Sequence, residues 1–305
     1  MVTRVGIIGM SPGDGHPFSF SAIINGYDEP GMAASDWPGI HAYVRRRDPA
    51  DFGVGTLRVT HAWTQDPEVT GRLCRASHIE RACRAPSDML GEVDAVIVAR
   101  DDHEHHHELA MPFLEAGLPV LVDKPLTLDP AELERYRPYL EEGRLMSASG
   151  LRWAMELDEV RADRSAWGEL QLLRGAVVND WARYGIHMLD ALLPLAGARP
   201  VAVTPHATRH ASVAIETDGG PLLLVDALGA VPKTFRIDVF GTTRVSHHEV
   251  NDNFTMFRRL LVAFAGMIET GTPAIPPGET LAVLRTLIAG HTAITNQSRI
   301  RIDEH

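Results

Sequence analysis

Val120-Leu-Val-Asp-Lys-Pro125 carries the strongest signal for fold and function in this 305-residue chain. Its apolar start predicts a buried strand, and Asp123 and Lys124 follow where that strand ends. Pro125 lacks an amide proton and restricts the residue before it to extended geometry, which holds the Lys124 backbone rigidly. Because open α/β sheets bind ligands at the carboxyl ends of their strands, Lys124 is a candidate catalytic residue.

Lysine is rare in this protein, which makes its position informative. The chain contains two lysines, Lys124 and Lys233, and arginine supplies nearly all of the remaining positive charge. A partly desolvated ammonium can lower its pKa and exchange a proton, whereas a guanidinium effectively cannot. A lysine at a strand end therefore favours a chemical role.

Strand-like and helix-like segments alternate through the first half of the chain. Apolar runs predict strands over residues 4–9, 58–64, 94–99 and 119–122. Helical patterns predict helices over residues 19–27, 104–117 and 130–142. This alternation is typical of α/β proteins with a Rossmann-type, doubly wound parallel sheet. The segment 28–56, rich in Pro, Gly and Asp, is expected to be an insertion or a mobile flap with one helix near 39–47.

The pattern changes after about residue 148. Strand-like segments now follow one another with a single helical segment, 184–196, among them: 170–179, 200–206, 211–217, 221–227 and 233–240. Two amphipathic helices come next, over residues 254–270 and 279–296. This half predicts an α+β domain with a mostly antiparallel open sheet. We expect a dinucleotide-binding domain over residues 1–125 and a substrate-binding and oligomerisation domain over residues 126–305.

Composition excludes several classes of function. The formal net charge of −11 opposes nucleic acid as a partner, because phosphate binding needs clustered Lys and Arg. No apolar run approaches the roughly 20 residues of a membrane helix, and no signal-peptide pattern is present, so a cytoplasmic location is expected. Cys74 and Cys83 match neither a CxxC nor a zinc spacing, and two buried free thiols are expected.

A glycine-rich turn follows the first predicted strand. Dinucleotide folds place GxGxxG there, so that backbone amides and a helix N-terminus meet the pyrophosphate. Here Gly9 is followed by Ser11 in place of the second glycine, and Gly13 and Gly15 arrive displaced by an insertion. We interpret these four residues as a cofactor-binding turn; the alternative is a plain glycine-rich loop.

The end of the second predicted strand bears on the choice of cofactor. NAD sites usually place an acidic residue there for the ribose hydroxyls. The position is occupied by Thr64. Without a carboxylate a 2′-phosphate would meet no repulsion, so the sequence leans towards NADP, or towards lost cofactor binding.

A histidine cluster gives a formal match to a zinc motif. His103-Glu-x-x-His107 fits HExxH, but it falls directly after a parallel strand and no third ligand is apparent downstream. We interpret it as a polar helix start with Asp101 and Asp102 as capping residues, and expect no metal site.

A second candidate site lies near residue 187. Arg183, His187 and Asp190 share one helix face at i, i+4 and i+7 spacing. A lone histidine on an amphipathic helix is usually structural. Tyr184 and His187, three positions apart, could instead serve as a proton-transfer pair.

Together these residues resemble the Gfo/Idh/MocA family of glucose–fructose oxidoreductase and inositol dehydrogenase relatives. The likeness is clearest in "DAVIVA" from residue 94, in His106 and in "FLEAGLPVLVDKP" up to residue 125. The resemblance implies that Lys124 contacts substrate and the nicotinamide ribose and that His187 is the catalytic histidine of the "DxGxH" motif. It also assigns His106, Asp123 and Pro125 to the cofactor site.

The resemblance implies NAD or NADP as cofactor and hydride transfer to or from a hydroxyl-bearing carbon of a sugar-like or cyclic polyol. His187 would move the hydroxyl proton and Lys124 would polarise the oxygen, with Tyr184 as a further catalytic candidate. The motif aspartate is replaced by Arg183, which suits an anionic substrate, and Arg183 and Asp190 are assigned to substrate binding.

Other functions stay open at this point. Within the same fold these are imine reduction and a redox-neutral reaction with retained cofactor. A non-enzymatic member with a degenerate nucleotide site is a third, motivated by Ser11 and Thr64. The exposed sheet face of the second half predicts a homodimer or homotetramer, as is common in this family.

Overall fold

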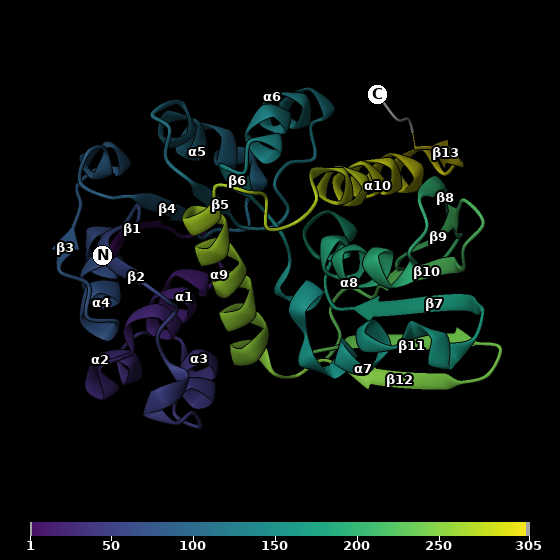
Figure 1. The fold of residues 1–305 in the computed structure, drawn as a ribbon, viewed down its shortest axis with the longest axis horizontal. Helices are drawn as coiled ribbons and strands as arrows, with labels where there is room; N and C mark the ends of the chain where they lie inside the picture. Colours follow the sequence, from purple (N-terminus) through teal and green to yellow (C-terminus); the bar gives the residue numbers. More distant parts are fainter. Residues whose placement is uncertain (1, 303–305) are drawn as a thin grey trace. The chain divides into compact units, whose positions relative to one another are not determined.

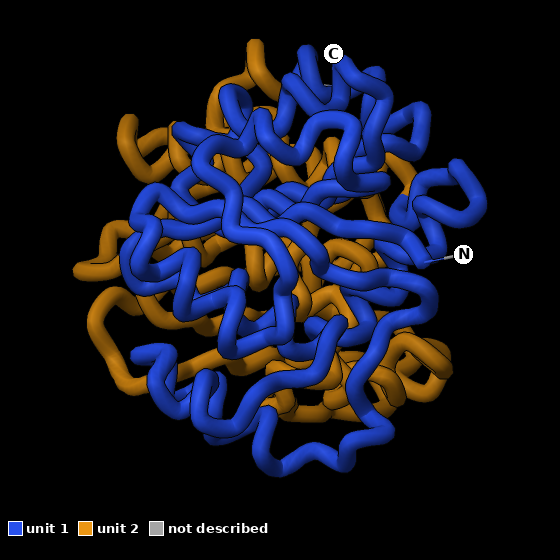
Figure 2. Tube along the Cα trace, turned by 90° about the vertical axis from the view of Figure 1, so that its left-hand side faces the viewer, with its two compact units in different colours: residues 1–126, 134–147, 257–275 blue, residues 127–133, 148–256, 276–305 orange. Residues whose placement is uncertain are grey.

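The computed structural model describes residues 2–302 (Figure 1). These residues form two compact units, coloured separately in Figure 2. The first comprises residues 2–126, 134–147 and 257–275, and the second comprises residues 127–133, 148–256 and 276–302. Helix α9 (Asn253–Thr270) thus belongs mostly to the first unit, although in sequence it lies between segments of the second.

A six-stranded parallel sheet forms the centre of the first unit. Its strands, in the order in which they pair, are β3 (Arg81–Ala82), β2 (Leu57–Trp63), β1 (Thr3–Ile8), β4 (Ala95–Val98), β5 (Val120–Val122) and β6 (Leu145–Met146). Every neighbouring pair is parallel. This strand order is that of dinucleotide-binding α/β sheets, so the predicted Rossmann-type fold is confirmed.

Helices on the sheet explain why its central strands are continuous apolar runs. Helix α1 (His16–Asn25) packs on β1 and β2, α4 (Pro67–Ala76) on β2 and β3, and α5 (His106–Glu115) on β4 and β5. All four residues of β4 are fully buried. Strands buried on both faces lose the alternation of polar and apolar residues that a half-exposed strand shows.

The segment 28–56 is a helical insertion rather than an irregular flap. It contains α2 (Glu29–Ala33), α3 (Pro38–Val44) and a 3-10 turn over Pro49–Asp51. Met32 and Val44 have no exposed surface, because α2 packs on α4 and α3 packs on α1. The insertion therefore adds to the core of the first unit.

Both cysteines of the first unit are free thiols, as predicted, but they are half-buried rather than fully buried. Cys74 lies in α4, and Cys83 directly follows β3, the short strand at the edge of the sheet. Burial still raises the pKa of both thiols, that of Cys74 to about 11. Neither is therefore activated as a thiolate.

A seven-stranded sheet forms the second unit. The strands, in pairing order, are β12 (Val245–Glu249), β11 (Phe235–Gly241), β7 (Leu170–Val177), β10 (Leu222–Ala227), β9 (Ala211–Thr217), β8 (Pro200–Pro205) and β13 (Ile300–Arg301). Only the β7–β10 pair is parallel. The predicted mostly antiparallel sheet is confirmed.

The two faces of this sheet differ in polarity. Helix α8 (Ile186–Ala196) packs on β7, and α10 (Pro277–Asn296) packs on β8 and β9. Helix α8 comes close to β7 at Gly175, where a Cβ atom would lie 2.7 Å from the Met188 sulfur. Elsewhere the strands carry charged pairs, such as Arg174 with Asp226 at 3.0 Å.

Among the described helices, none is long and apolar enough to cross a membrane.

Helix α10 packs against an indole ring at a position that only glycine fits. The Trp181 ring nitrogen donates to the Leu287 carbonyl at 2.9 Å. A Cβ atom at Gly290 would lie 2.6 Å from Cε2 of the same ring. At Gly278, in the first turn of the same helix, an added Cβ would meet nothing within 4 Å.

We expect Gly290→Ala to lower the free energy of unfolding by about 1–3 kcal/mol, the usual cost of overpacking a core. Gly278→Ala is the matched control and should leave stability unchanged or raise it by less than about 1 kcal/mol, because alanine is the better helix former. Urea unfolding followed by circular dichroism measures both. Equal losses in the two variants would show that the indole contact is not what matters.

Candidate active site

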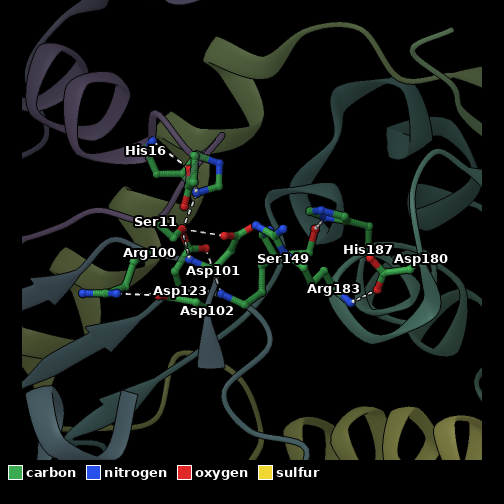
Figure 3. Close-up of polar contacts among 12 residues, drawn as sticks. Ser11, His16, Arg100, Asp101, Asp102, Asp123, Ser149, Asp180, Arg183 and His187 are labelled. Atoms are coloured by element: carbon green, nitrogen blue, oxygen red, sulfur yellow. Dashed lines mark hydrogen bonds and ion pairs between the residues drawn. The ribbon is translucent and has the colours of Figure 1, made fainter. Parts of the chain in front are cut away.

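Buried charges gather at one edge of the first sheet, where β1, β4 and β5 end. The turn between β1 and α1 supplies Ser11 and Asp14, and His16 is the first residue of α1. Asp101 lies three residues after β4; Figure 3 labels Ser11, His16 and Asp101. Asp123 and Lys124 follow β5. Because the carboxyl ends of parallel strands meet at one edge, side chains from three separate segments come together here.

The glycines of the turn serve different physical needs. Gly13 has a φ of +83°, a conformation that side chains rarely adopt, and a Cβ added there would meet nothing within 4 Å. A Cβ at Gly15 would instead lie 2.6–2.7 Å from Ile40 and Trp37. One glycine is therefore required by backbone conformation and the other by packing against the insertion. The predicted role of both, and of Gly9, in cofactor binding stays a prediction.

Ser11 joins the turn to the end of β4. Its hydroxyl donates to Asp101 Oδ1 at 2.6 Å, and the Asp101 amide donates to Ser11 Oγ at 3.1 Å. The other Asp101 oxygen lies 3.6 Å from Lys124 Nζ, and the Lys124 residue is only 4% exposed. The sequence presented Ser11 as a lost glycine; in the structure its hydroxyl orients the carboxylate that pairs with Lys124.

His16 lies between two carboxylates. Its Nδ1 is hydrogen-bonded to Asp123 Oδ2 and lies 3.2 Å from Asp14 Oδ1. The Lys124 amide donates to Asp123 Oδ1 at 2.8 Å. Burial raises the pKa of Asp14 to about 7. Burial also acts to raise the pKa of Asp123, but attraction to His16 and Lys124 outweighs it and lowers that pKa.

Sequence reasoning missed Asp14, His16 and the pairing role of Asp101. A signal for Asp101 was available, because it lies two residues after the end of a predicted strand, near the same edge of the sheet as Asp123. His16 also begins a helix immediately after the glycine-rich turn, where a ligand-binding role is common.

His106 connects the ends of two strands. One ring nitrogen lies 2.7 Å from the Arg100 carbonyl oxygen and the other 3.1 Å from that of Leu126. The ring is fully buried, and burial lowers the pKa of His106. Both nitrogens thus face backbone of the first unit, so the contribution of His106 to a cofactor site would be to hold Arg100 and Leu126 in place.

Thr64 directly follows β2, as predicted, but its hydroxyl is engaged locally. Oγ1 donates to the Asp66 carbonyl at 2.7 Å and lies 2.8 Å from Thr70 Oγ1. Asp66 in turn accepts from the Glu68 amide and caps α4. The preference for NADP rests on the missing carboxylate alone and stays a prediction.

Pro125 follows Lys124 through a cis peptide bond.

The first turn of α1 fits a pyrophosphate less well than the rest of the sheet edge. The His16 amide donates to Asp14 Oδ1 at 2.9 Å, and Pro17 has no amide proton. The amides of Phe18 and Ser19 bond to the Gly15 carbonyl. The helix start therefore offers a carboxylate where amides would suit an anion, and the binding of a dinucleotide at this turn stays a prediction.

A second polar group surrounds His187 in the second unit. Its Nδ1 lies 2.6 Å from Ser149 Oγ (Figure 3). The rings of Tyr184 and Phe235 lie edge-on to the imidazole, with centroids 5.1 and 5.5 Å away. The predicted neighbours Tyr184 and His187 are thus brought together, while Ser149 was missed because it lies 38 positions away in sequence.

Asp190 supports this group from one turn further along α8. Its Oδ2 accepts from the Ser149 amide at 2.6 Å, and its Oδ1 pairs with Arg152 at 3.1 Å. Burial raises the pKa of Asp190. These contacts fix Ser149, whose hydroxyl lies next to His187 Nδ1. The assignment of Asp190 to substrate binding stays a prediction.

Arg183 differs in setting from the other two members of the predicted helix face. It lies in a π-helical turn, Trp181–Gly185, that precedes α8, and its amide donates to the capping Asp180 side chain. His187 and Asp190 lie in α8 itself. The regular i, i+4, i+7 spacing is therefore interrupted between Arg183 and His187.

The HExxH histidines do not share one regular helix. A 3-10 turn, His103–His105, precedes α5, and the His107 ring faces Tyr136 at 5.9 Å. Within residues 2–302, the group of three side chains spaced to hold a metal is a different one, Asp14, His16 and Asp123.

Comparisons with known proteins agree with this architecture. Residues 38–148 match the model of the Gfo/Idh/MocA family, described as an oxidoreductase family with an NAD-binding Rossmann fold. Over this segment the chain is similar to the Gfo/Idh/MocA family. The matched segment ends just after β6 and begins after the glycine-rich turn, which is the part that departs from the usual motif.

Relatives by sequence are inositol dehydrogenases. Inositol 2-dehydrogenase 1 of Saccharopolyspora erythraea is 32% identical over 46% of this chain and 47% of its own length. Inositol 2-dehydrogenase 2 of the same organism is 30% identical over 56% of this chain and 59% of its own length. The chain spans about half the length of the curated relatives it matches.

Solved structures show the same fold over the whole chain. Myo-inositol 2-dehydrogenase of Lactobacillus plantarum superimposes with a TM-score of 0.78 at 13% identity, covering 99% of this chain and 100% of that one. Scyllo-inositol dehydrogenase of Lactobacillus casei, solved with NAD(H) and scyllo-inositol, gives 0.74 at 13% identity and covers 99% of each.

We expect Ser11→Ala to destabilise the first unit by about 1–3 kcal/mol, because it removes a hydrogen bond to the buried carboxylate of Asp101. Ser77→Ala is the matched control. The Ser77 hydroxyl is also buried but has no hydrogen-bond partner in the described part of the chain, so its removal should be nearly neutral. Urea unfolding of both variants measures the difference, and equal stabilities would contradict the proposed Ser11–Asp101 link.

Proposed function

We propose that this protein is an NAD(P)-dependent oxidoreductase that transfers hydride between nicotinamide and a hydroxyl or ketone carbon of a cyclic polyol such as an inositol. One observation carries the proposal: a buried lysine, Lys124, stands at the carboxyl end of β5 in a sheet of dinucleotide-binding order. It lies within the segment that matches an NAD-binding oxidoreductase family. The inositol dehydrogenase relatives support the substrate class.

Each catalytic residue has a distinct proposed task. The nicotinamide ring, when bound, supplies the hydride acceptor or donor. Lys124, fixed by Asp101, would donate a hydrogen bond to the reacting oxygen and polarise the bond to carbon. His187, oriented through Nδ1 by Ser149, would take up or return the hydroxyl proton, with Tyr184 beside it.

The proposed cofactor is NAD, with NADP as the alternative. The family description and the NAD(H)-bound structure of the Lactobacillus casei enzyme support NAD. The absence of a carboxylate at Thr64 supports NADP. A second candidate function, a family member that binds no dinucleotide, is favoured by the carboxylate of Asp14 at the start of α1.

Titration separates these possibilities. Quenching of tryptophan fluorescence by NADH and by NADPH should give a dissociation constant on the order of micromolar for at least one of them. The tighter ligand identifies the cofactor. If neither dinucleotide binds, the oxidoreductase proposal is wrong and the non-enzymatic alternative takes its place.

We expect Lys124→Ala to reduce inositol-dependent formation of NADH by about 100-fold or more, since general-acid and polarising groups contribute that much. Lys124→Arg should lose activity too, because the guanidinium keeps the charge but neither fits nor exchanges the proton. Lys233→Ala removes the other lysine of the chain, at an exposed position, and should keep full activity. Circular dichroism confirms folding; activity retained in both Lys124 variants would assign the lysine a structural role.

A further inference from the structure

Asp14, His16 and Asp123 form a compact group of metal-ligating atoms in the first unit. One oxygen or nitrogen from each lies within 4.8 Å of the other two. The three residues come from the glycine-rich turn, the first position of α1 and the residue after β5. Their convergence follows from the sheet topology, which brings the ends of β1 and β5 to the same edge.

One ligand separation, that between His16 and Asp14, is close to the separation of two ligands around a divalent ion. Zinc binds histidine nitrogen and carboxylate oxygen at about 2.0–2.2 Å, so two ligand atoms on one tetrahedral ion lie roughly 3.3–3.5 Å apart. His16 Nδ1 and Asp14 Oδ1 are 3.2 Å apart. The third ligand, Asp123 Oδ2, is hydrogen-bonded to the same nitrogen, and an ion would take the place of the shared proton.

A second observation points to a missing partner. Asp14 is 95% buried, since only 5% of its surface is exposed, and its Oδ2 has no hydrogen-bond partner among residues 2–302. An unsatisfied buried oxygen of a carboxylate is costly, and proteins rarely leave one without a function. Metal coordination would satisfy that oxygen.

The surroundings hold the ligands in place. The His16 ring stacks on Phe20 with centroids 4.9 Å apart, and the Phe257 ring meets it edge-on at 5.0 Å. The Lys124 amide fixes Asp123 through its second oxygen. In metal sites, contacts of this kind to the ligating side chains orient them towards the ion. The His16 side chain is 18% exposed, which leaves a route for an ion and for a water ligand.

Charge balance also favours a cation. Three buried carboxylates, those of Asp14, Asp101 and Asp123, are gathered at this edge of the sheet, and Lys124 is the lysine paired with them. His16, which faces both Asp14 and Asp123, is a second basic group beside them. A dication on its Nδ1 would replace the imidazole proton and, together with Lys124, balance the three carboxylates. Carboxylate and imidazole ligands suit zinc and manganese rather than the soft ions that prefer sulfur.

We propose that Asp14, His16 and Asp123 bind one divalent transition-metal ion, Zn²⁺ or Mn²⁺. This reverses the expectation from sequence, which considered only the HExxH histidines. The site consists of residues of the first unit alone and does not depend on the proposed oxidoreductase activity.

Equilibrium dialysis of chelator-treated, tag-free protein against Zn²⁺ or Mn²⁺, without dinucleotide or substrate, tests the proposal. The wild type should retain one equivalent of at least one of the two ions, measured by mass spectrometry. Asp14→Asn and His16→Gln should each weaken binding at least about tenfold, an effect seen even for residues that only support metal ligands. The double variant His103→Gln/His107→Gln is the matched control and should bind as the wild type does.

A thermal shift keeps the test decisive if a variant folds poorly. Added metal should raise the melting temperature of the wild type and of the control, because an ion that binds only the folded state stabilises it. The Asp14→Asn and His16→Gln substitutions should remove that shift. Absence of a bound ion in the wild type, or loss of binding in the HExxH variant instead, would overturn the proposal. Neither result would bear on whether the protein binds NADH.

Discussion

The contact between Asp101 and Lys124 is the constraint on which the first unit's site depends. Both groups are almost fully buried, and an ion pair removed from water is maintained only if the remaining hydrogen-bonding capacity is satisfied. The Ser11 hydroxyl supplies one of those bonds from the turn after β1. The pair thereby connects the ends of three strands, and the position of the lysine follows from the position of the turn.

Burial also explains which features of the fold could be predicted from the sequence. Strands β4 and β5 are continuous apolar runs, and β1 is one from Val5 onwards, because burial on both faces leaves no polar positions. Such runs are visible without a structure. Strands β3 and β6 have two residues each, too few to carry a pattern. Their pairing depends on neighbours that the fold supplies.

The candidate site residues differ in the same way. Lys124 and His187 could be chosen as candidates because each lies in a local sequence motif, and their catalytic roles stay predictions. Ser149 could not, because its role arises from contacts with α8 and not from its sequence neighbours. Ser11 was visible only as a departure from a glycine pattern, since its partner Asp101 lies 90 positions away. Spacing rules record which residues are unusual, whereas three-dimensional contacts decide what they do.

The start of α1 shows how far this chain departs from the usual dinucleotide turn. A motif with glycine at its second and third positions leaves the first amides of the helix free for phosphate. In this chain the Asp14 carboxylate accepts a hydrogen bond from the first of those amides, that of His16. Pro17 has no amide proton, and the Ser11 hydroxyl donates to Asp101. The family match accordingly begins only at residue 38.

In the second unit, too, a pair of oppositely charged side chains positions a candidate catalytic residue. Arg152 and Asp190 are buried together, and Asp190 uses its second oxygen to hold the Ser149 amide. The Ser149 hydroxyl is then directed at His187 Nδ1, which fixes the orientation of the imidazole ring. A histidine that moves a proton must present one nitrogen in a defined direction, and it can do so only if the other is fixed. In each unit a buried charged pair thus positions a serine or a lysine, and that residue in turn defines the geometry of the proposed chemistry.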